Sequence, residues 1–525
     1  MRLWFYILSI VALAAIFSAR FVEPAVLWLL LVAVPLIGLG LYDIHVSVSN
    51  VLRNYPLIGH LRYMLEFISP EIQQYFIETP QSGRPYNREP RAVVYRRAKA
   101  VPDTTPFGTV KDLDDNGTEF AFHSLAPKHV TEECGRIRVG GPQCTQPYLA
   151  SRLNISGMSF GALSARAVEA MNKGAKRGNF AQSTGEGGLS PYHLKHGGDV
   201  IWQIGTGYFS CRTPDGRFDP NAFAERARQP SVKMIEVKLS QGAKPSHGGI
   251  LPAAKITEEI SRIRLVPMGV DCLSPPAHPE FSSPRGLLEF VARLRDLSGG
   301  KPTGFKLCLG VRSEFMGIVK AMLETGILPD FITVDGAEGG TGAAPPEFSD
   351  SLGTPINEAL PFVQAALVGA GLREHIRVIA SGKVVTGFDM VSKLALGADM
   401  CAVARPMMFA VGCIQARSCG NNKCPTGVAT QDPVRMAAID IENKHKRVAN
   451  YHAATVKSFL ELVGAMGLDD PGQLTPAHIF RRVDDGPAQT FAQLYEYVAP
   501  GALVGDSPPP GPHAEAWAVA SADRF

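Results

Sequence analysis

The sequence predicts an α/β protein: a TIM-type (β/α)8 barrel with an N-terminal transmembrane helical hairpin and flanking helices. Three observations predict this fold. Short apolar strands alternate with helical segments between about residues 151 and 432. Almost every predicted strand ends in a turn rich in Gly or Ser, as barrel strands do where they carry chemistry. Two long segments without charged side chains precede this region.

A chain of 525 residues has room for one large barrel and flanking segments. Its net charge of +3 is too close to neutral for a nucleic-acid-binding surface, so no nucleic acid is expected as a partner. The predicted parts are a transmembrane hairpin (1–43), a helical and irregular segment (44–150), the barrel (151–432), C-terminal helices (433–485) and a Pro/Gly-rich tail (486–525).

The N-terminal segments 3–19 and 24–42 carry no charged residue. Each is close to the roughly 20 residues needed to cross a bilayer. A signal peptide is the alternative for the first segment, but the second would remain after cleavage. A buried helical hairpin is disfavoured because neither segment has a polar face. Arg2, Arg53 and Arg62 flank the pair and favour both ends in the cytoplasm, with the protein in the cell inner membrane and the catalytic part on its cytoplasmic face.

Nine segments have the composition of buried parallel strands, although a barrel needs only eight, so one must be an insertion or wrong. The strand candidates are 153–156, 179–182, 200–204, 234–239, 270–273, 304–309, 331–334, 377–380 and 400–404, and helices are expected at 162–177, 284–297, 313–325, 356–371 and 387–396. After Gly486 the chain is rich in Pro, Gly and Ala. The run Ser507–Pro512 predicts a disordered tail.

Three cysteines, Cys413, Cys419 and Cys424, lie within twelve residues, and Pro425 follows the last. Thiolates that converge from one loop are the ligands of an iron–sulfur cluster. Buried structural thiols are the main alternative. Zinc is disfavoured because it usually takes four ligands at closer spacing, and a disulfide because the other six cysteines are scattered, as in a reducing compartment.

Two early loops carry candidate site residues. The loop after the first strand contains Gly157, Met158 and Ser159, where glycine lets the backbone approach a flat ring. A tight turn with a Ser cap is the alternative. The loop after the second strand holds Glu186 among glycines, which suits a carboxylate that faces a ligand, although a solvated turn has the same composition.

Two lysines are candidates for charge stabilisation. Lys244, after the strand at 234–239, can bind an anionic substrate. Lys306 interrupts an apolar strand, and lysine is rarely buried without a partner. Directed into the barrel mouth, it would stabilise a reduced flavin at the N1/C2=O edge. The alternative is a lysine whose charged group reaches the surface from a strand end.

The late barrel loops are rich in glycine and basic residues. Gly339 and Gly340 follow the strand at 331–334, and Gly382 and Lys383 follow the next strand. Arg405 follows the last strand. Successive glycine N–H groups near such a cation form a cradle for a phosphate. Each loop alone is equally compatible with a tight turn.

Over about residues 150–432 the sequence resembles the FMN-binding domain of glutamate synthase. The shared blocks, in the same order, are Gly-Met-Ser-x-Gly-x-Leu-Ser, Gly-Glu-Gly-Gly, Gln-Gly-Ala-Lys-Pro, Ser-Pro-Pro-x-His, Gly-Gly-Thr-Gly-Ala and the cysteine loop continuing into Gly427–Asp432. The resemblance implies a 3Fe–4S cluster on Cys413, Cys419 and Cys424 beside FMN. It implies FMN contacts from Gly157, Met158, Ser159, Gln203, Lys306, Gly339, Gly340, Gly382, Lys383 and Arg405.

The resemblance also implies that 2-oxoglutarate, or the 2-iminoglutarate formed from it with ammonia, lies near Glu186, Lys244 and Lys306 as catalytic residues. The expected activity is reduction of this imine, or a related one, to an amino acid in glutamate biosynthesis. A membrane-bound flavin and iron–sulfur electron-transfer subunit without its own substrate is the alternative, and a barrel without flavin is a third possibility.

The sequence departs from full glutamate synthase in several ways. It starts with Met before a membrane segment, so no N-terminal cysteine nucleophile or glutaminase domain is expected, and there is no room for a large C-terminal β-helix. No dinucleotide fingerprint follows a predicted strand. A stand-alone, membrane-associated protein is therefore expected, with ammonia from elsewhere and electrons from an external donor such as ferredoxin or a reductase subunit.

Overall fold

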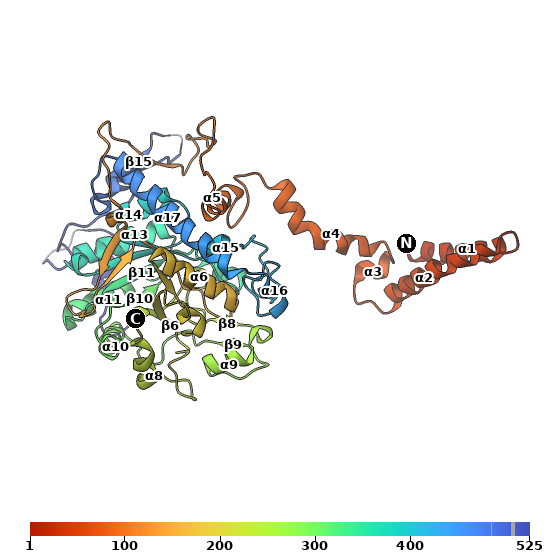
Figure 1. Cartoon of the computed structure of the whole chain (residues 1–525), viewed down its shortest axis with the longest axis horizontal. Helices are drawn as coiled ribbons and strands as arrows, with labels where there is room; N and C mark the ends of the chain where they lie inside the picture. Colours follow the sequence, from red (N-terminus) through yellow and green to blue (C-terminus); the bar gives the residue numbers. More distant parts are fainter. Residues whose placement is uncertain (485, 506–509) are drawn as a thin grey trace. The chain divides into compact units, whose positions relative to one another are not determined.

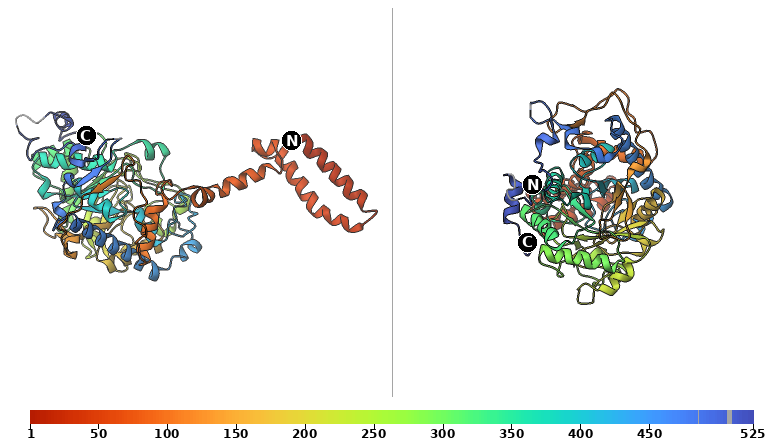
Figure 2. Two further views of the ribbon diagram at one scale, coloured as in Figure 1. Left: turned by 90° about the horizontal axis from the view of Figure 1, so that it is seen from above. Right: turned by 90° about the vertical axis from the view of Figure 1, so that its left-hand side faces the viewer.

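The computed structural model describes residues 1–484, 486–505 and 510–525. The chain forms two compact units, Met1–Glu89 and Pro90–Phe525. In the second unit, eight parallel strands close into a barrel with helices on its outside (Figure 1 and Figure 2). The predicted (β/α)8 barrel with flanking helices is confirmed.

The barrel strands are short and fully enclosed by helices, which explains their continuous apolar runs. They are β4 (Leu153–Ile155), β5 (Ala181–Ser183), β6 (Asp199–Ile204), β7 (Val232–Lys238), β10 (Thr303–Leu307), β11 (Phe331–Asp335), β12 (Arg377–Ser381) and β13 (Met400–Val403). The barrel closes where β13 pairs in parallel with β4, with Cys401 opposite Leu153.

The candidate strand at 270–273 does not belong to the barrel. Its last two residues form β9 (Cys272–Leu273), which pairs antiparallel with β8 (Ile250–Leu251). This hairpin lies in the long connection between β7 and β10, together with the short helix η4 (Ala253–Lys255) and α9 (Glu258–Arg264). Leu273 is 67% exposed, so the apolar run is not a core strand. Periodicity cannot separate such a short run from a buried strand.

The predicted helices are present with small shifts at their ends. The helices around the barrel are α6 (Ala165–Gly178), α8 (Pro220–Ala227), α10 (Pro284–Leu297), α11 (Arg312–Thr325), α13 (Ile356–Gly369), α14 (Gly387–Ala395) and α15 (Arg405–Val411). Serine or threonine caps several of them; Ser164, for example, accepts a hydrogen bond from Ala167 N. The long helix α17 (Ile441–Ala465) packs along α6 at Gly174, where a Cβ would lie 2.7 Å from Val448 (Figure 1).

A small hairpin closes the N-terminal end of the barrel. It consists of β2 (Arg136–Val139) and β3 (Tyr148–Ser151). Val139, Tyr148 and Ala150 pack in one buried cluster with residues of the barrel strands, including Ile201 and Met234. Because this end is filled by apolar side chains, the loops at the C-terminal end are left for chemistry.

Short elements complete the second unit. They are α5 (Arg88–Ala98), β1 (Glu119–Ala121), η3 (Glu132–Gly135), α7 (Pro191–Leu194), α12 (Pro346–Ser351), η5 (Arg373–His375), α16 (Pro433–Ala437), η6 (Pro471–Gln473), η7 (Pro476–His478), β14 (Ile479–Arg481), β15 (Gln489–Thr490), α18 (Phe491–Leu494) and α19 (Pro512–Val519). The expectation of a disordered tail is wrong for its described residues, since Phe491 and Leu503 are buried. Part of the proline run at 507–512 lies outside the described residues.

The first unit begins with two antiparallel apolar helices. They are α1 (Arg2–Ala19) and the continuous pair η1 (Pro24–Leu29) and α2 (Leu30–His45), both long and apolar enough to cross a membrane. A Cβ at Gly40 would overlap the Phe5 ring, so glycine permits their close packing. The helices α3 (Asn50–Asn54), α4 (Gly59–Ile72) and η2 (Gln73–Ile77) follow. Insertion of the hairpin in a membrane remains a prediction.

Candidate active site

All eight barrel strands place a predicted site residue at or after their C-terminal end. Because the strands are parallel, these ends meet at one rim. In chain order the residues are Gly157, Met158 and Ser159 after β4, Glu186 after β5, Gln203 in β6, Lys244 after β7, Lys306 in β10, Gly339 and Gly340 after β11, Gly382 and Lys383 after β12, and Arg405 after β13.

Two buried lysines lie side by side on adjacent strands of this rim. Lys306 of β10 pairs in register with Lys238 of β7, so both side chains leave the same face. Lys238 Nζ lies 3.0 Å from Glu186 Oε1, and Lys306 Nζ lies 3.6 Å from Asp335 Oδ1. A carboxylate at the same rim therefore offsets each cation: Glu186, from the loop after β5, and Asp335, at the end of β11.

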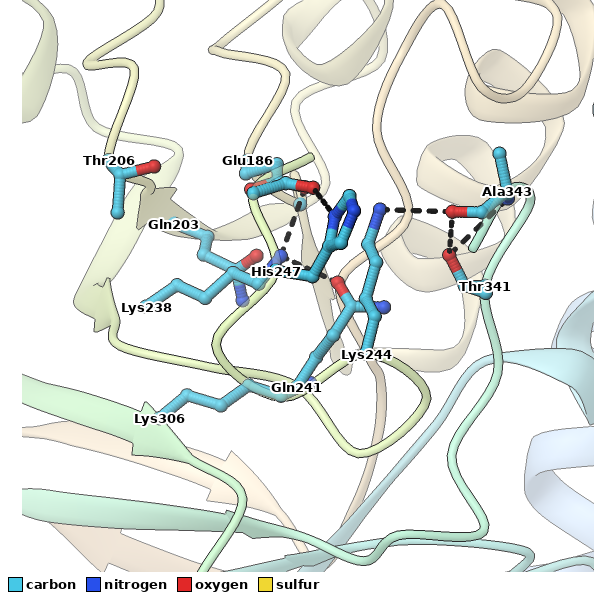
Figure 3. Close-up of polar contacts among 12 residues, drawn as sticks. Glu186, Gln203, Thr206, Lys238, Gln241, Lys244, His247, Lys306, Thr341 and Ala343 are labelled. Atoms are coloured by element: carbon cyan, nitrogen blue, oxygen red, sulfur yellow. Dashed lines mark hydrogen bonds and ion pairs between the residues drawn. The ribbon is translucent and has the colours of Figure 1, made fainter. Parts of the chain in front are cut away.

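Glu186, Lys238, Gln241 and Lys244 converge above the strand ends (Figure 3). Lys238 Nζ donates to Gln241 Oε1 at 2.6 Å, and Lys244 Nζ donates to the Ala343 carbonyl at 3.2 Å. Burial acts to raise the pKa of Glu186, but the charges of Lys238 and Lys244 outweigh it, so the pKa lies below its usual range. Glu186 is therefore ionised at neutral pH.

Lys244 combines burial with two neighbouring charges of opposite sign. Burial lowers the pKa of Lys244 to about 8, while Glu186 acts to raise it and Lys238 to lower it further. The ammonium group is therefore charged at neutral pH but begins to lose its proton in mildly alkaline solution. A ligand carboxylate would compensate this positive charge.

A polar cluster lies beneath the rim, inside the barrel. Gln203 Nε2 donates to Glu236 Oε2 at 2.5 Å, and Thr333 Oγ1 donates to Glu236 Oε1 at 2.7 Å. Glu236 and Thr333 line a small cavity together with Ser156 and Gly157. A Cβ on Gly157 would lie 3.0 Å from Gln203 Nε2, so the loop after β4 rests directly on this amide.

The glycine and basic loops after β11, β12 and β13 are neighbours. A Cβ on Gly340 would lie 2.9 Å from Arg405 Nε, and Arg405 Nη2 donates to the Glu338 carbonyl at 2.7 Å. A Cβ on Gly382 would lie 3.5 Å from the backbone nitrogen of Gly336 in the same glycine loop. A backbone without side chains beside a guanidinium group is suited to a phosphate.

A neutral histidine supports the backbone beneath the lysines. His278 Nε2 donates to the Lys238 carbonyl at 2.9 Å and Tyr208 Oη donates to His278 Nδ1 at 3.0 Å. Burial lowers the pKa of His278 to about 4, so the ring stays uncharged. His278 belongs to the Ser-Pro-Pro-x-His block. This block therefore supports the backbone of the site and supplies no charge to it.

The cysteine loop lies at the same end of the barrel as the glycine loops. It follows α15, and Cys419 Cβ lies 4.0 Å from where a Cβ of Gly342 would be. A Cβ on Gly420 would lie 3.0 Å from the Gly342 carbonyl. The loop is thus next to the glycine loop after β11, as expected if a cluster and a flavin share one rim.

The three thiols differ in their surroundings. Burial acts to raise the pKa of Cys424, but hydrogen bonds from the backbone of Ala429 and from Thr426 outweigh it and lower the pKa below its usual range. Burial raises the pKa of Cys413 to about 12, and the neighbouring thiols of the loop add to this. Gln415 N–H donates to Cys413 Sγ at 3.4 Å. N–H donors of this kind stabilise cluster thiolates.

Among the described residues, no three His, Cys, Asp or Glu side chains lie close enough to hold a single metal ion. All nine cysteines are free thiols. The thiols of Cys413, Cys419 and Cys424 interact with one another, and Cys413 and Cys424 accept hydrogen bonds from backbone N–H groups. This donor set fits the ligands of an iron–sulfur cluster.

Sequence reasoning missed several polar residues of the rim and of the barrel interior beneath it. Lys238 and Glu236 interrupt an apolar strand in the same way as Lys306, so the signal that identified Lys306 applies to them as well. Asp335 ends β11 and also accepts a hydrogen bond from Gly242 N at 2.8 Å. Its position directly after the apolar run at 331–334 is a usable signal.

The fold and the rim define a class: an FMN-binding (β/α)8-barrel oxidoreductase. Residues 124–469 match the family model described as a conserved region in glutamate synthase, which covers well over half of the chain. The chain belongs to the glutamate synthase family and is an oxidoreductase of that type, acting on CH–NH2 donors.

The similar proteins include stand-alone members of this family. The chain is 38% identical over 478 residues to the glutamate synthase large subunit-like protein YerD of Bacillus subtilis, covering 83% of this chain and 90% of that protein. It is 35% identical over 322 residues to the archaeal glutamate synthase (NADPH) of Methanocaldococcus jannaschii, covering 61% of this chain and 60% of that protein. Among solved structures, the recombinant flavin-binding domain of baker's yeast flavocytochrome b2 matches with a TM-score of 0.41 and 12% identity, covering 79% of this chain and 85% of that one.

Proposed function

We propose that the protein reduces 2-iminoglutarate, formed from 2-oxoglutarate and ammonia, or a closely related imine, to an amino acid. The observation that carries this proposal is the convergence of Glu186, Lys238 and Lys244 beside the glycine loops of one rim. The family membership supports the same chemistry, and the B. subtilis relative, 90% of whose length the chain covers, is named glutamate synthase large subunit-like.

The lysines of the rim suit a dicarboxylic substrate. In this proposal Lys244 holds a substrate carboxylate, and Lys306 balances negative charge on the reduced cofactor. 2-Oxoglutarate and ammonia combine with loss of water to give the imine, whose carbon takes a hydride and whose nitrogen takes a proton. Glu186, ionised and paired with Lys238, orients the nitrogen or relays to it a proton taken from a neighbouring ammonium group.

The residues that would hold FMN are Gly157, Met158, Ser159, Gln203, Lys306, Gly339, Gly340, Gly382, Lys383 and Arg405. Bound there, FMN supplies hydride transfer. Cys413, Cys419 and Cys424 would hold a 3Fe–4S cluster, whose electrons come from an external one-electron donor such as ferredoxin or a reductase subunit. The lowered pKa of Cys424 and the N–H donor on Cys413 support this assignment.

We further infer that α1 and α2 anchor the protein in the cell inner membrane, with the barrel on the cytoplasmic face. The two helices are apolar, and 6% of each candidate span is buried within the structure. Arg2 and Arg53 flank the pair, and basic residues favour the cytoplasmic side. A membrane position would place the protein beside a membrane-bound or cytoplasmic electron donor.

Anaerobic purification followed by a visible spectrum and by FMN, iron and sulfide quantitation tests the cofactors. We expect about one FMN and three irons per chain. The reduced protein should then be reoxidised by 2-oxoglutarate plus ammonia, with glutamate formed. Reduced protein that holds both cofactors but does not respond would favour an electron-transfer subunit without its own substrate. A colourless protein would contradict the proposal.

A further inference from the structure

One lysine outside the substrate site is enclosed beside the cysteine loop. Lys255 ends the short helix η4 and is 2% exposed. Its Nζ donates to three backbone carbonyls: Ala162 at 2.6 Å, Cys419 at 3.1 Å and Ala429 at 3.2 Å. An ammonium group has three N–H donors, so the hydrogen bonds use all of them.

The three carbonyls belong to segments that are far apart in the sequence. Ala162 lies in the loop after β4, just beyond the predicted flavin contacts at Gly157–Ser159. Cys419 is a predicted cluster ligand, and Ala429 lies five residues after Cys424. A single buried side chain thus joins the loop assigned to the flavin and the loop assigned to the cluster.

Other contacts hold the same segments together without charge. Asn422 Nδ2 donates to the Ala254 carbonyl at 3.0 Å, next to Lys255. Gln431 Nε2 donates to the carbonyls of Gly161 at 3.0 Å and Leu163 at 2.8 Å. Since neutral amides already make such links, hydrogen bonding alone does not require a buried ammonium group, whose desolvation is costly.

The charge of Lys255 has a counterpart in the cysteine loop. The Lys255 ammonium group donates to the carbonyl of Cys419, one of the three cysteines assigned to the cluster. An iron–sulfur cluster on three thiolates gains one more negative charge when it is reduced. A fixed cation nearby stabilises the reduced state relative to the oxidised one, which raises the reduction potential.

We propose that Lys255 is a positioning residue that clamps the cysteine loop to the loop after β4 and keeps a positive charge beside the cluster to favour its reduction. The clamp follows from the three hydrogen bonds alone. The electrostatic part rests on the proposed function, because it requires that Cys413, Cys419 and Cys424 hold a cluster.

The clamp is tested on the full-length protein as purified, by hydrogen–deuterium exchange over residues 412–431. Lys255→Met keeps the length of the side chain and removes the charge and the three donors. We expect exchange in this segment to become at least tenfold faster. Lys423→Met alters an exposed lysine of the same loop and should leave exchange unchanged. Equal exchange in wild type and Lys255→Met would overturn the clamp.

The electrostatic part is tested on the holoenzyme by a redox titration monitored by electron paramagnetic resonance of the cluster. In Lys255→Met we expect the cluster potential to fall by the equivalent of a tenfold change in the reduction equilibrium, which is 59 mV for one electron. Lys255→Arg keeps the charge and should stay close to wild type. If Lys255 only packed the loop, the exchange rate would change in Lys255→Met. The cluster potential would then not depend on whether the side chain at this position is charged.

Each result leads to a decision. If Lys255→Met keeps its FMN and its cluster potential is unchanged, the electrostatic part is wrong. If that variant does not fold, Lys255→Arg decides: a wild-type potential supports the charge assignment and a tenfold shift overturns it. Wild-type protein without iron would instead contradict the proposed function, while the exchange measurement would still decide the clamp.

Discussion

Lys244 is the residue whose ionisation should be most visible in kinetics. Burial lowers the pKa of Lys244 to about 8, so the charged form decreases as pH rises through that value. If this ammonium group holds a substrate carboxylate, the KM for 2-oxoglutarate should be low below pH 8 and rise above it. Steady-state assays from pH 6.5 to 9.5 measure this, and a KM independent of pH would argue against the assignment.

Replacing Lys244 separates this effect from other titrations. Lys244→Gln should raise the KM for 2-oxoglutarate about tenfold or more, because a charge-assisted hydrogen bond contributes roughly 1.5–3 kcal/mol. The rise of KM above pH 8 should disappear in this variant. Lys176→Gln removes an exposed lysine of α6 and serves as the control, with wild-type kinetics expected.

Glu186 should affect turnover more than binding. Glu186→Gln removes the partner of Lys238 and the group placed to move a proton, so kcat should fall about 10²- to 10⁴-fold. The KM for a dicarboxylate should not rise, because the change removes a negative charge from the site. Steady-state kinetics with FMN quantitation tests this; normal kcat in a variant with full FMN content would exclude a catalytic role.

Among single residues, the sequence identified those that differ in character from their immediate neighbours in the chain. Lys306 interrupts an apolar strand, and Glu186 stands among glycines, so both attract attention without any structure. Lys255 carries no such local signal. Its three carbonyl partners come from residues 162, 419 and 429, and only the folded chain brings them to one side chain.

Among the elements, the loop after β7 depends on one glycine. A Cβ on Gly242 would lie 1.6 Å from the Gly336 carbonyl, so this loop and the loop after β11 touch through bare backbone. Gly242→Ala should separate the loops that carry Lys244 and Gly339. We expect loss of FMN content and destabilisation of about 1–3 kcal/mol, as for other overpacked sites.

FMN quantitation and thermal unfolding measure this effect. Gly310→Ala is the matched control, because Gly310 also lies in a loop after a barrel strand and a Cβ there would meet nothing within 4 Å. The control should keep full FMN content and its melting temperature. Similar behaviour of the two variants would show that contact between the loops does not position the flavin.

The cysteine loop allows a direct test of its assigned ligands. Cys419→Ser should lower the iron and sulfide content strongly while FMN remains bound, because serine is a poor ligand for the cluster. Cys134→Ser removes a thiol far along the chain from the loop and should keep all three contents. Retention of full iron and sulfide by Cys419→Ser would remove this cysteine from the ligand set.

Elements with a strong pattern were predictable, and short or unusual ones were not. Eight of nine strand candidates are barrel strands because apolar strands alternate with capped helices. The prediction at 270–273 failed because a short segment with three apolar residues also suits a surface hairpin. The tail was wrongly predicted to be disordered, because its overall composition does not reveal single packed residues, such as Leu503, which lies against Gly369.

For the whole molecule, the main prediction concerns its compartment. Full-length protein should sediment with membranes, resist alkaline carbonate and be released by detergent, because its two apolar segments are each long enough to cross a bilayer. Protease added to spheroplasts should leave the barrel intact if it faces the cytoplasm. Recovery in the soluble fraction would contradict membrane insertion.

The fold class followed from the sequence because alternation of strands and helices over nearly 300 residues has few other solutions. The closure of the N-terminal end of the barrel by β2 and β3 did not follow from the sequence. No local feature distinguishes the residues of that hairpin from ordinary turns and short strands. The membrane position of the first unit is indicated by composition alone, and the experiment on cells described above tests it.

The pairing of Lys238 with Lys306 has a practical consequence for anyone assaying the enzyme. Together with Lys244 they give the rim three ammonium groups against the two carboxylates of Glu186 and Asp335, so the rim attracts small inorganic anions as well as substrate. Sulfate or phosphate from a buffer would then compete with substrate and depress the measured rate. Amine buffers with little added salt are the conditions under which weak activity is most readily detected.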